Sequence, residues 1–402
     1  MIVRAADPKE YDDIYELADA AFKSYPERMM IEVTVSDDPH FRPGDLRVVS
    51  VDGNVVSMMM LLRRPLRIGT AVVNGAIIAP VATHPDHQGK KYCSAVMRDA
   101  VRYMKTQRFD ITILWGNTWL YPHYGYSPAM VKTELVIKPT QKKANVKKPF
   151  QIRPFMAADV ESISRIYNHN TATRTCAEVR SPAMWEWRSS GSEVKLEVVT
   201  DAKGKVIGYW SLGTDWGRPC AHEVGVINNE ACSVVFNHLL ETAKTKGVTE
   251  FYCITHPTHS FTRFAFLQGS ELRIRSGGGA GMVRVLNPAL LLTAMKKEFE
   301  RRLHHSELHD FEGSLTIVSE ETVVLNIDQG SVSIDIEAVR GVFQLDIPLP
   351  LFNPLITGYL GINELVKKPH VMVTGGNRVL RLIDILFPAG LPSGGFLPLV
   401  WE

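Results

Sequence analysis

The sequence predicts an α/β (α+β) protein of three domains, and three observations support this. Strand-like and helix-like stretches alternate through the first part of the chain, and segments of residues 1–140 recur in residues 150–285. The offset is about 150 residues, far more than the roughly 20–50 residues of a solenoid repeat, so it indicates a duplicated domain. After Leu286 the pattern changes to short alternating strands between helical stretches, which predicts a third domain at residues 286–402.

The elements of the first domain follow from local signals. Asp7 suits the N-cap of a helix, Pro8 its first position and Glu10 its third, which together make a capping-box pattern. Asp52-Gly53-Asn54 has the residue chemistry of a hairpin turn between two strand-like stretches. The expected strands are residues 1–4, 45–51, 55–63, 71–81 and 111–115, and the expected helices are the stretch after Asp7 and residues 94–106.

The elements of the second domain follow from its likeness to the first. Ile152-Arg153-Pro154 corresponds to Val3-Arg4-Ala5, and Lys203-Gly204-Lys205-Val206-Ile207 corresponds to Asp52-Gly53-Asn54-Val55-Val56. Residues 141–149 lie between the two domains and contain lysines but almost nothing apolar. This composition favours a solvated linker over a basic patch for an acidic partner.

Composition and charge exclude several classes of protein. The chain has 402 residues, with 45 Lys and Arg against 43 Asp and Glu, and the net charge of +2 argues against a broad nucleic-acid-binding face. The five cysteines show no CxxC spacing, so neither a zinc knuckle nor a redox dithiol is indicated. The first ten residues lack the apolar core of a signal peptide, and the apolar run at residues 342–360 is broken by Asp346 and prolines. We therefore expect a cytoplasmic protein without a metal, a nucleic-acid partner or a membrane partner.

The segment from Val81 to Ser94 carries the most chemical information. It has the pattern of a strand end, a short polar loop with a glycine, and a helix start. Backbone N–H groups at a helix N-terminus attract anions, and Gln88, Lys90 and Lys91 add donors and positive charge. This pattern is typical of a pyrophosphate site, while a plain strand-to-helix connection with a polar loop fits the segment equally well.

A second informative segment, residues 117–126, ends in Tyr121-Pro122-His123-Tyr124-Gly125-Tyr126. Together the two segments resemble the GCN5-related N-acetyltransferase (GNAT) superfamily. In that family a Q/R-x-x-G-x-G/A loop holds the pyrophosphate of coenzyme A, and a later aromatic-x-x-x-G-aromatic element completes the cofactor site. Gln88-Gly89-Lys90-Lys91-Tyr92-Cys93 corresponds to the loop, with Lys91 and Cys93 where the family prefers glycine or another small residue. A side chain at Lys91 limits how closely the backbone approaches a phosphate.

The whole chain resembles the enhanced intracellular survival (Eis) family of acetyltransferases in the order and length of its parts. That resemblance implies two tandem GNAT-type domains, the second degenerate, followed by a sterol-carrier-like α+β domain. The C-terminal segments Leu355-Ile356-Thr357-Gly358-Tyr359-Leu360 and Arg381-Leu382-Ile383-Asp384-Ile385-Leu386-Phe387-Pro388 are similar to that family's pattern. Relatives in the family assemble as homo-hexamers.

The resemblance also implies a reaction and a set of residues. The co-substrate would be acetyl-CoA, and the acceptor would be a primary amine of a cationic small molecule such as an aminoglycoside. Tyr126 corresponds to the family's general acid for the departing thiolate, and the C-terminal carboxylate, here on Glu402, corresponds to its base. Contacts to the coenzyme are implied for Val81, Ala82, Thr83, Gln88, Gly89, Lys90, Lys91, Tyr92, Cys93, Ser94 and Asn117. The chain continues past Phe396, near which relatives commonly end, to Trp401 and Glu402.

Other functions stay open at the level of the sequence. The protein could be a carrier that holds an apolar ligand in its third domain, or it could acetylate protein lysines. Acidic residues would suit a cationic acceptor, and the candidates for contacting it are Phe22, Tyr25, Glu27, Asp37 and Asp38.

Two further segments are expected to bind nothing. The middle domain's counterpart of the loop, residues 224–232, has no Lys or Arg and contains Glu230, so we expect no acetyl-CoA there. His304, His305, His309 and Asp310 resemble a metal cluster, but without an HExxH pattern they predict an exposed helix.

Overall fold

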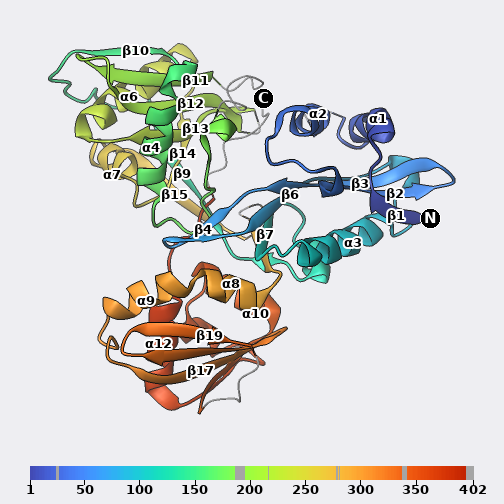
Figure 1. Cartoon of the computed structure of the whole chain (residues 1–402). Coiled ribbons are helices and arrows are strands. Elements are labelled where there is room, and N and C mark those ends of the chain that lie inside the picture. The colour runs from blue at the N-terminus through green and yellow to red at the C-terminus, as the bar shows by residue number, and fades with distance from the viewer. Residues whose placement is uncertain are drawn as a thin grey trace.

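The computed structural model describes residues 1–23, 27–185, 195–215, 217–277, 279, 281–336 and 342–394. Its strands form two 7-stranded sheets, one 5-stranded sheet and a two-stranded hairpin. Figure 1 shows the N-terminal domain at the right, the middle domain at the upper left and the C-terminal domain below them. The α/β (α+β) fold class is confirmed. Among the described residues, none of the helices combines the length and the apolar character needed to cross a bilayer.

The first sheet has the strand order β1-β2-β3-β6-β7-β16-β8. Helices α1 (Tyr11–Ala21) and α2 (Glu27–Asp37) cover one face, and α3 (Tyr92–Thr106) covers the other (Figure 1). Successive residues of β3 alternate between the two cores, because side chains of a strand point to opposite faces. The strands are β1 (Ile2–Ala5), β2 (Leu46–Val51), β3 (Asn54–Arg63), β6 (Gly75–Thr83), β7 (Ile111–Leu114), β8 (Ser127–Pro128) and β16 (Met282–Val285).

Local signals in this domain are confirmed. The side chain of Asp7 accepts from the Lys9 amide at 3.0 Å, and Glu10 accepts from the Asp7 amide at 2.8 Å, which forms the capping box. The hairpin between β2 and β3 turns through Asp52 and Gly53, whose φ angles of 52° and 89° are those of the turn that matches strand twist. Helix α3 begins two residues before the expected start, at Tyr92.

The second sheet has the order β10-β11-β12-β13-β14-β9-β15. Strand β9 follows β8 in the chain but lies in this sheet, while β16 returns to the first sheet between β7 and β8. The domain boundaries expected from the sequence, 1–140, 150–285 and 286–402, stay predictions, and these two strands cross between the sheets. The strands are β9 (Val131–Ile137), β10 (Phe150–Pro154), β11 (Lys195–Asp201), β12 (Val206–Asp215), β13 (Arg218–Val226), β14 (Phe251–Ile254) and β15 (Glu271–Ser276), and the helices are α4 (Val160–Thr171), α6 (Asn229–Thr245) and α7 (Ser260–Leu267).

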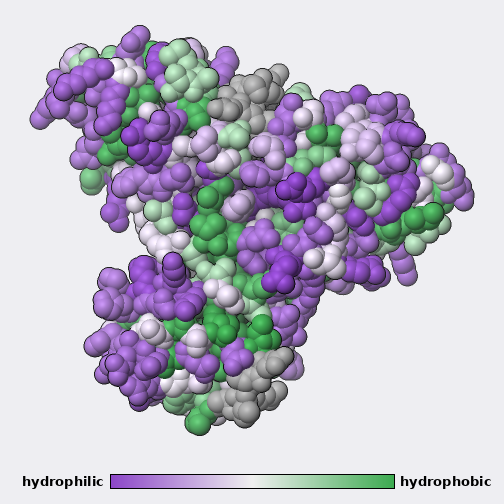
Figure 2. All heavy atoms as spheres, viewed as in Figure 1, coloured by the Kyte–Doolittle hydropathy of each residue, from purple (hydrophilic) through white to green (hydrophobic). Residues whose placement is uncertain are grey.

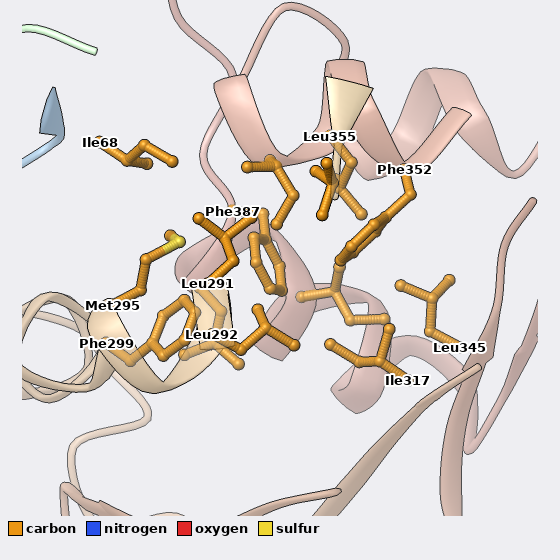
Figure 3. Packing of buried hydrophobic residues seen from close by; sticks show 14 of the residues in the cluster. Ile68, Leu291, Leu292, Met295, Phe299, Ile317, Leu345, Phe352, Leu355 and Phe387 are labelled. Carbon is orange, nitrogen blue, oxygen red and sulfur yellow. The ribbon is translucent and has the colours of Figure 1, made fainter. Parts of the chain in front are cut away.

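The C-terminal part forms a sheet of order β19-β18-β17-β20-β21 with helices packed on it. Its core also takes in the hairpin β4 (Leu66–Ile68) and β5 (Ala71–Val73), which extends from the first domain. Figure 3 shows Ile68 of this hairpin close to Met295 and Phe387 of the third domain. The elements are α8 (Pro288–Ala294), α9 (Lys296–His304), β17 (Glu312–Val318), β18 (Thr322–Asp328), β19 (Ser331–Asp335), β20 (Phe343–Asp346), α10 (Leu349–Thr357), α11 (Ile362–Leu365), β21 (Met372–Thr374) and α12 (Gly376–Leu386).

Candidate active site

Strands β6 and β7 separate beside the expected cofactor segment. They pair in parallel only from Gly75 opposite Ile111 to Ile77 opposite Ile113, and β6 then continues to Thr83. Beyond that point Val81, Ala82 and Thr83 pair with β3 on their other side. Among the described residues no strand pairs with the opposite edge of this segment, and such an edge can accept an extended ligand by backbone hydrogen bonds.

The loop after β6 presents a helix N-terminus without a side-chain cap. Lys91 is the N-cap of α3, its side chain accepts no capping bond, and its φ of 66° is left-handed. Ala95 is the first residue of the helix whose amide donates within it, to the Lys91 carbonyl at 3.0 Å, so the amides of residues 92–94 point out of the helix end. Gln88, Gly89, Lys90 and Lys91 are exposed around this end, and Tyr92, Cys93 and Ser94 are half-buried. This arrangement suits a phosphate group.

Three tyrosines, Tyr121, Tyr124 and Tyr126, pack in the same core as α3. The Tyr124 hydroxyl donates to Ser94 Oγ at 2.9 Å, which ties the aromatic segment to the helix N-terminus. The rings of Tyr121 and Tyr126 meet edge to face, 6.3 Å between centroids. The Tyr126 hydroxyl donates to Thr112 Oγ1 at 3.4 Å, and the residue is 1% exposed.

The electrostatics of these phenols favour the protonated form. Burial raises the pKa of Tyr121 to about 12 and raises the pKa of Tyr126 further, while the hydrogen bond between Tyr126 and Thr112 acts in the opposite direction. Both side chains therefore carry their proton at neutral pH, as a general acid must.

Asn117 lies outside this cluster. It is exposed just after β7, and its carbonyl accepts from the Leu120 amide at 3.1 Å and the Tyr121 amide at 3.3 Å. Its backbone therefore begins the turn that carries Tyr121, and its side chain is open to solvent.

Residues far away in the sequence hold the tyrosine segment in place. Arg284 of β16 donates to the Tyr124 carbonyl, and Asn353 of α10 donates to the Gly125 carbonyl and to Ser127 Oγ, both at 3.0 Å. No motif in the sequence indicates these partners, because strand exchange and domain packing bring them to the site.

The residues expected to contact the acceptor differ in burial and in their partners. Asp38 is 7% exposed and forms a 2.6 Å ion pair with Arg64, so it is a structural residue and is not available to a substrate. Burial raises the pKa of Glu27, and its Oε2 has no hydrogen-bond partner among the described residues. Phe22 is half-buried and Asp37 exposed, while Tyr25 lies outside the described residues.

Glu402, the expected base, also lies outside the described residues, which end at Gly394. The segment before it is anchored to the middle domain. Arg174 Nε donates to the Ser393 carbonyl at 2.9 Å, and the Val131 amide donates to the Pro392 carbonyl at 2.8 Å.

Residues 2–129 match the family model of the acetyltransferase (GNAT) domain. The N-terminal domain is a GNAT acetyltransferase domain. The chain is therefore an acyltransferase by the family of this domain. None of the curated proteins matches the sequence.

Solved structures share the fold of this chain over nearly its whole length. A probable N-acyltransferase from Enterococcus faecalis has a TM-score of 0.75 at 16% identity, with 98% of each chain covered. A GCN5-related N-acetyltransferase from Kribbella flavida also has a TM-score of 0.75 at 16% identity, with coverage of 98% of this chain and 97% of that one. Eis1 from Mycobacterium abscessus has a TM-score of 0.65 at 16% identity, with coverage of 98% and 100%. The chain therefore shares its fold with these proteins, Eis1 among them.

The middle domain differs from the GNAT domain at the corresponding helix end. Asn228 caps α6, and its side chain accepts from the Ala231 amide at 2.9 Å. The position that a phosphate would take at an uncapped helix N-terminus is thus filled by the side-chain oxygen of Asn228, with Glu230 beside it in the first turn.

The histidines at the end of α9 face their own backbone. His305 Nδ1 lies 2.8 Å from the Arg301 carbonyl, and His309 Nδ1 lies 3.2 Å from the Ser306 carbonyl. Within the part of the chain that the structure describes, no group of three or more His, Cys, Asp or Glu side chains is arranged to hold a metal ion.

Proposed function

We propose that this protein transfers an acetyl group from acetyl-CoA to a primary amine of a cationic small molecule, of the aminoglycoside type. The observation that carries the proposal is the hydrogen bond between Tyr124 and Ser94, which joins the uncapped N-terminus of α3 to the three tyrosines. This contact supports a proposed phosphate site that adjoins the proposed proton donors, beside the edge of β6 that β7 leaves unpaired.

The proposed coenzyme site uses the residues expected from the sequence. The pyrophosphate would lie on the amides of residues 92–94, with Gln88, Lys90 and Lys91 around it. The pantetheine arm would extend along Val81, Ala82 and Thr83. No metal is needed for this chemistry, since the charge that develops on sulfur is removed by a proton.

In the proposed reaction the amine nitrogen attacks the thioester carbonyl carbon, a C–N bond forms and the C–S bond breaks. Tyr126 gives its phenolic proton to the sulfur, and the amine proton passes to the C-terminal carboxylate of Glu402. Glu27 is proposed to pair with a cationic acceptor, because its buried, unpartnered oxygen lies at the start of α2. The cytoplasmic location, the homo-hexamer and the sterol-carrier-like character of the third domain belong to the proposal through the family resemblance alone.

The test compares Tyr126→Phe with Tyr121→Phe by the release of coenzyme A from acetyl-CoA in the presence of an amine panel. We expect Tyr126→Phe to lower kcat by about 100-fold, since general acid catalysis contributes roughly 10²–10⁴-fold. The KM for acetyl-CoA should stay within about twofold, because the phenol acts on the leaving group and the substrate's remote contacts persist. Because burial raises the pKa of Tyr126, the wild-type rate should not fall as pH rises toward the ordinary tyrosine value of about 10.

Tyr121→Phe serves as the matched control, since it removes a neighbouring phenol. A large loss of kcat in Tyr121→Phe with normal turnover in Tyr126→Phe would assign the acid to Tyr121 instead. Removal of Trp401 and Glu402 should abolish turnover, and an unchanged rate in that truncation would refute the proposed base. If no amine in the panel releases coenzyme A, the enzymatic proposal fails.

A further inference from the structure

A cavity of about 530 Å³ lies where the three domains meet. Its walls come from the β4–β5 hairpin, the C-terminal end of α4, the loop before α7, helix α9 and the strap of residues 388–392. Figure 2 shows the surface hollowed at the left, where the middle domain faces the third domain, with hydrophilic residues on both sides. The lining shares no residue with α3, β7 or the tyrosine segment, so the cavity is separate from the proposed acetyl-CoA site.

His259 lines this cavity and carries an unsatisfied donor. The residue is 7% exposed, and burial lowers its pKa to about 3, so the ring is neutral and carries one proton. Nδ1 accepts from the Phe261 amide at 3.1 Å, which assigns the proton to Nε2. Nε2 has no hydrogen-bond partner among the described residues. A buried N–H group in this state indicates a ligand that brings an acceptor.

Arg174 adds a cation beside this donor. Its Nε and Nη2 hold Ser393, at 2.9 Å from the carbonyl and 3.2 Å from Oγ. These bonds fix the guanidinium, and within the described part of the chain they leave the N–H groups of Nη1 for another acceptor. The nearby His256 already has a hydrogen-bond partner, because its Nε2 lies 3.0 Å from the Leu391 carbonyl.

The charge of the lining is positive. Arg301 and Arg302 of α9 also face the cavity, and among the described residues that line it Glu298 is the sole carboxylate. Glu298 is already bound, with Arg301 at 2.7 Å and Arg302 at 2.8 Å. Three guanidinium groups and one engaged carboxylate would repel the cationic acceptor proposed above, and they leave donors in excess over acceptors.

We propose that this cavity binds a small anion that carries phosphate or carboxylate oxygens. Such a ligand would accept hydrogen bonds from His259 Nε2 and Arg174 Nη1 and would be drawn in by the charge of Arg301. A phosphate and a carboxylate offer the same acceptor chemistry, so the experiment separates the two sources.

The test titrates the full-length protein with inorganic phosphate and, in a second arm, with citrate, by calorimetry at constant ionic strength. We expect saturable binding in at least one arm, and the arm that binds identifies the class of anion. His259→Asn keeps an acceptor for the Phe261 amide, as a helix N-cap needs, and removes the Nε2 proton. This variant and Arg301→Gln should each weaken binding about tenfold, the scale of one lost charge-assisted hydrogen bond.

Arg165→Gln is the matched control, because it makes the same charge change at an exposed position of α4 outside the cavity. It should bind as the wild type does. Absence of saturable binding in both arms overturns the proposal, as does wild-type affinity in both His259→Asn and Arg301→Gln. Circular dichroism of each variant confirms that it is folded. Acetyl-CoA turnover is measured separately, because it depends on residues that do not line the cavity.

Discussion

At the scale of single residues, Lys91 shows how the cofactor loop keeps its shape with a residue that the GNAT motif disfavours. Its backbone is left-handed, with φ of 66°, and it directly precedes the first turn of α3. For a residue with a Cβ atom this conformation costs roughly 1–2 kcal/mol, whereas glycine adopts it freely. Lys91 therefore adopts the left-handed backbone that glycine would adopt in the motif, at a cost in folding stability. Its side chain adds a positive charge beside the N-terminus of α3.

Lys91→Gly should accordingly raise the free energy of unfolding by about 1 kcal/mol, because glycine removes the left-handed strain. Urea denaturation followed by circular dichroism measures the change. Lys90→Gly is the control, since Lys90 is also exposed but its backbone is not left-handed. That variant should lower stability by roughly 0.5–1 kcal/mol. Equal effects of the two substitutions would contradict the argument.

At the scale of secondary-structure elements, helix α10 of the third domain supports the tyrosine segment of the first. The buried Asn353 uses its amide nitrogen for the Gly125 carbonyl and Ser127 Oγ, and its oxygen accepts from the Val285 amide at 2.9 Å. One turn later, Thr357 donates to the Ala129 carbonyl at 2.8 Å. The side chain of Asn353 thus holds Gly125 and Ser127, the two neighbours of Tyr126 in the chain. Asn353 therefore acts as a positioning residue for Tyr126.

Asn353→Asp keeps the size of the side chain but cannot donate to the Gly125 carbonyl. We expect kcat to fall about tenfold, with a smaller change in the KM for acetyl-CoA, because the phenol of Tyr126 is displaced while the phosphate loop is intact. Stability should fall by about 1–3 kcal/mol, the cost of an unpaired buried polar group. Thr357→Val removes one bond from the same helix, farther from Tyr126. If both variants lose kcat in proportion to stability, Asn353 has only a structural role.

At the scale of the whole molecule, a buried chain of charges joins the first two sheets. Arg64, at the end of β3, pairs with Asp38 at 2.6 Å and with Glu178 of the middle domain at 3.0 Å. Glu178 pairs in turn with Arg180, which binds Glu223 at 2.8 Å. The side chain of Arg64 is fully buried, so removing it would take a buried cation away from both Asp38 and Glu178.

Arg64→Ala should therefore destabilise the protein by about 3–5 kcal/mol, as breaking a buried ion pair does. Arg28→Ala is the control, because Arg28 also contacts two carboxylates, Asp19 and Glu32, but is 44% exposed. An exposed pair contributes about 0–1 kcal/mol. Both values come from chemical denaturation, and a loss in Arg64→Ala no larger than in Arg28→Ala would disprove the role of the buried chain.

Local features of the fold were predictable because they depend on neighbouring residues. The capping box at Asp7, the turn at Asp52 and Gly53, and the helix after Lys91 follow from short-range hydrogen bonds and backbone preferences. Residues 131–137 form strand β9, but nothing in these residues alone says which sheet the strand joins. That choice depends on edges formed by residues more than a hundred positions away.

The sequence by itself determined the α/β class, the duplication, the polar loop before α3 and the tyrosine segment, since each depends on the pattern of residues that are adjacent in the chain. Only the tertiary structure decided that β9 and β16 exchange sheets, that Asn353 and Arg284 hold the tyrosine segment, and that Asp38 is buried beside Arg64. It alone brings three domains together around a cationic cavity. The physical reason is that strand pairing and burial are settled by contacts between distant segments, which no local pattern specifies.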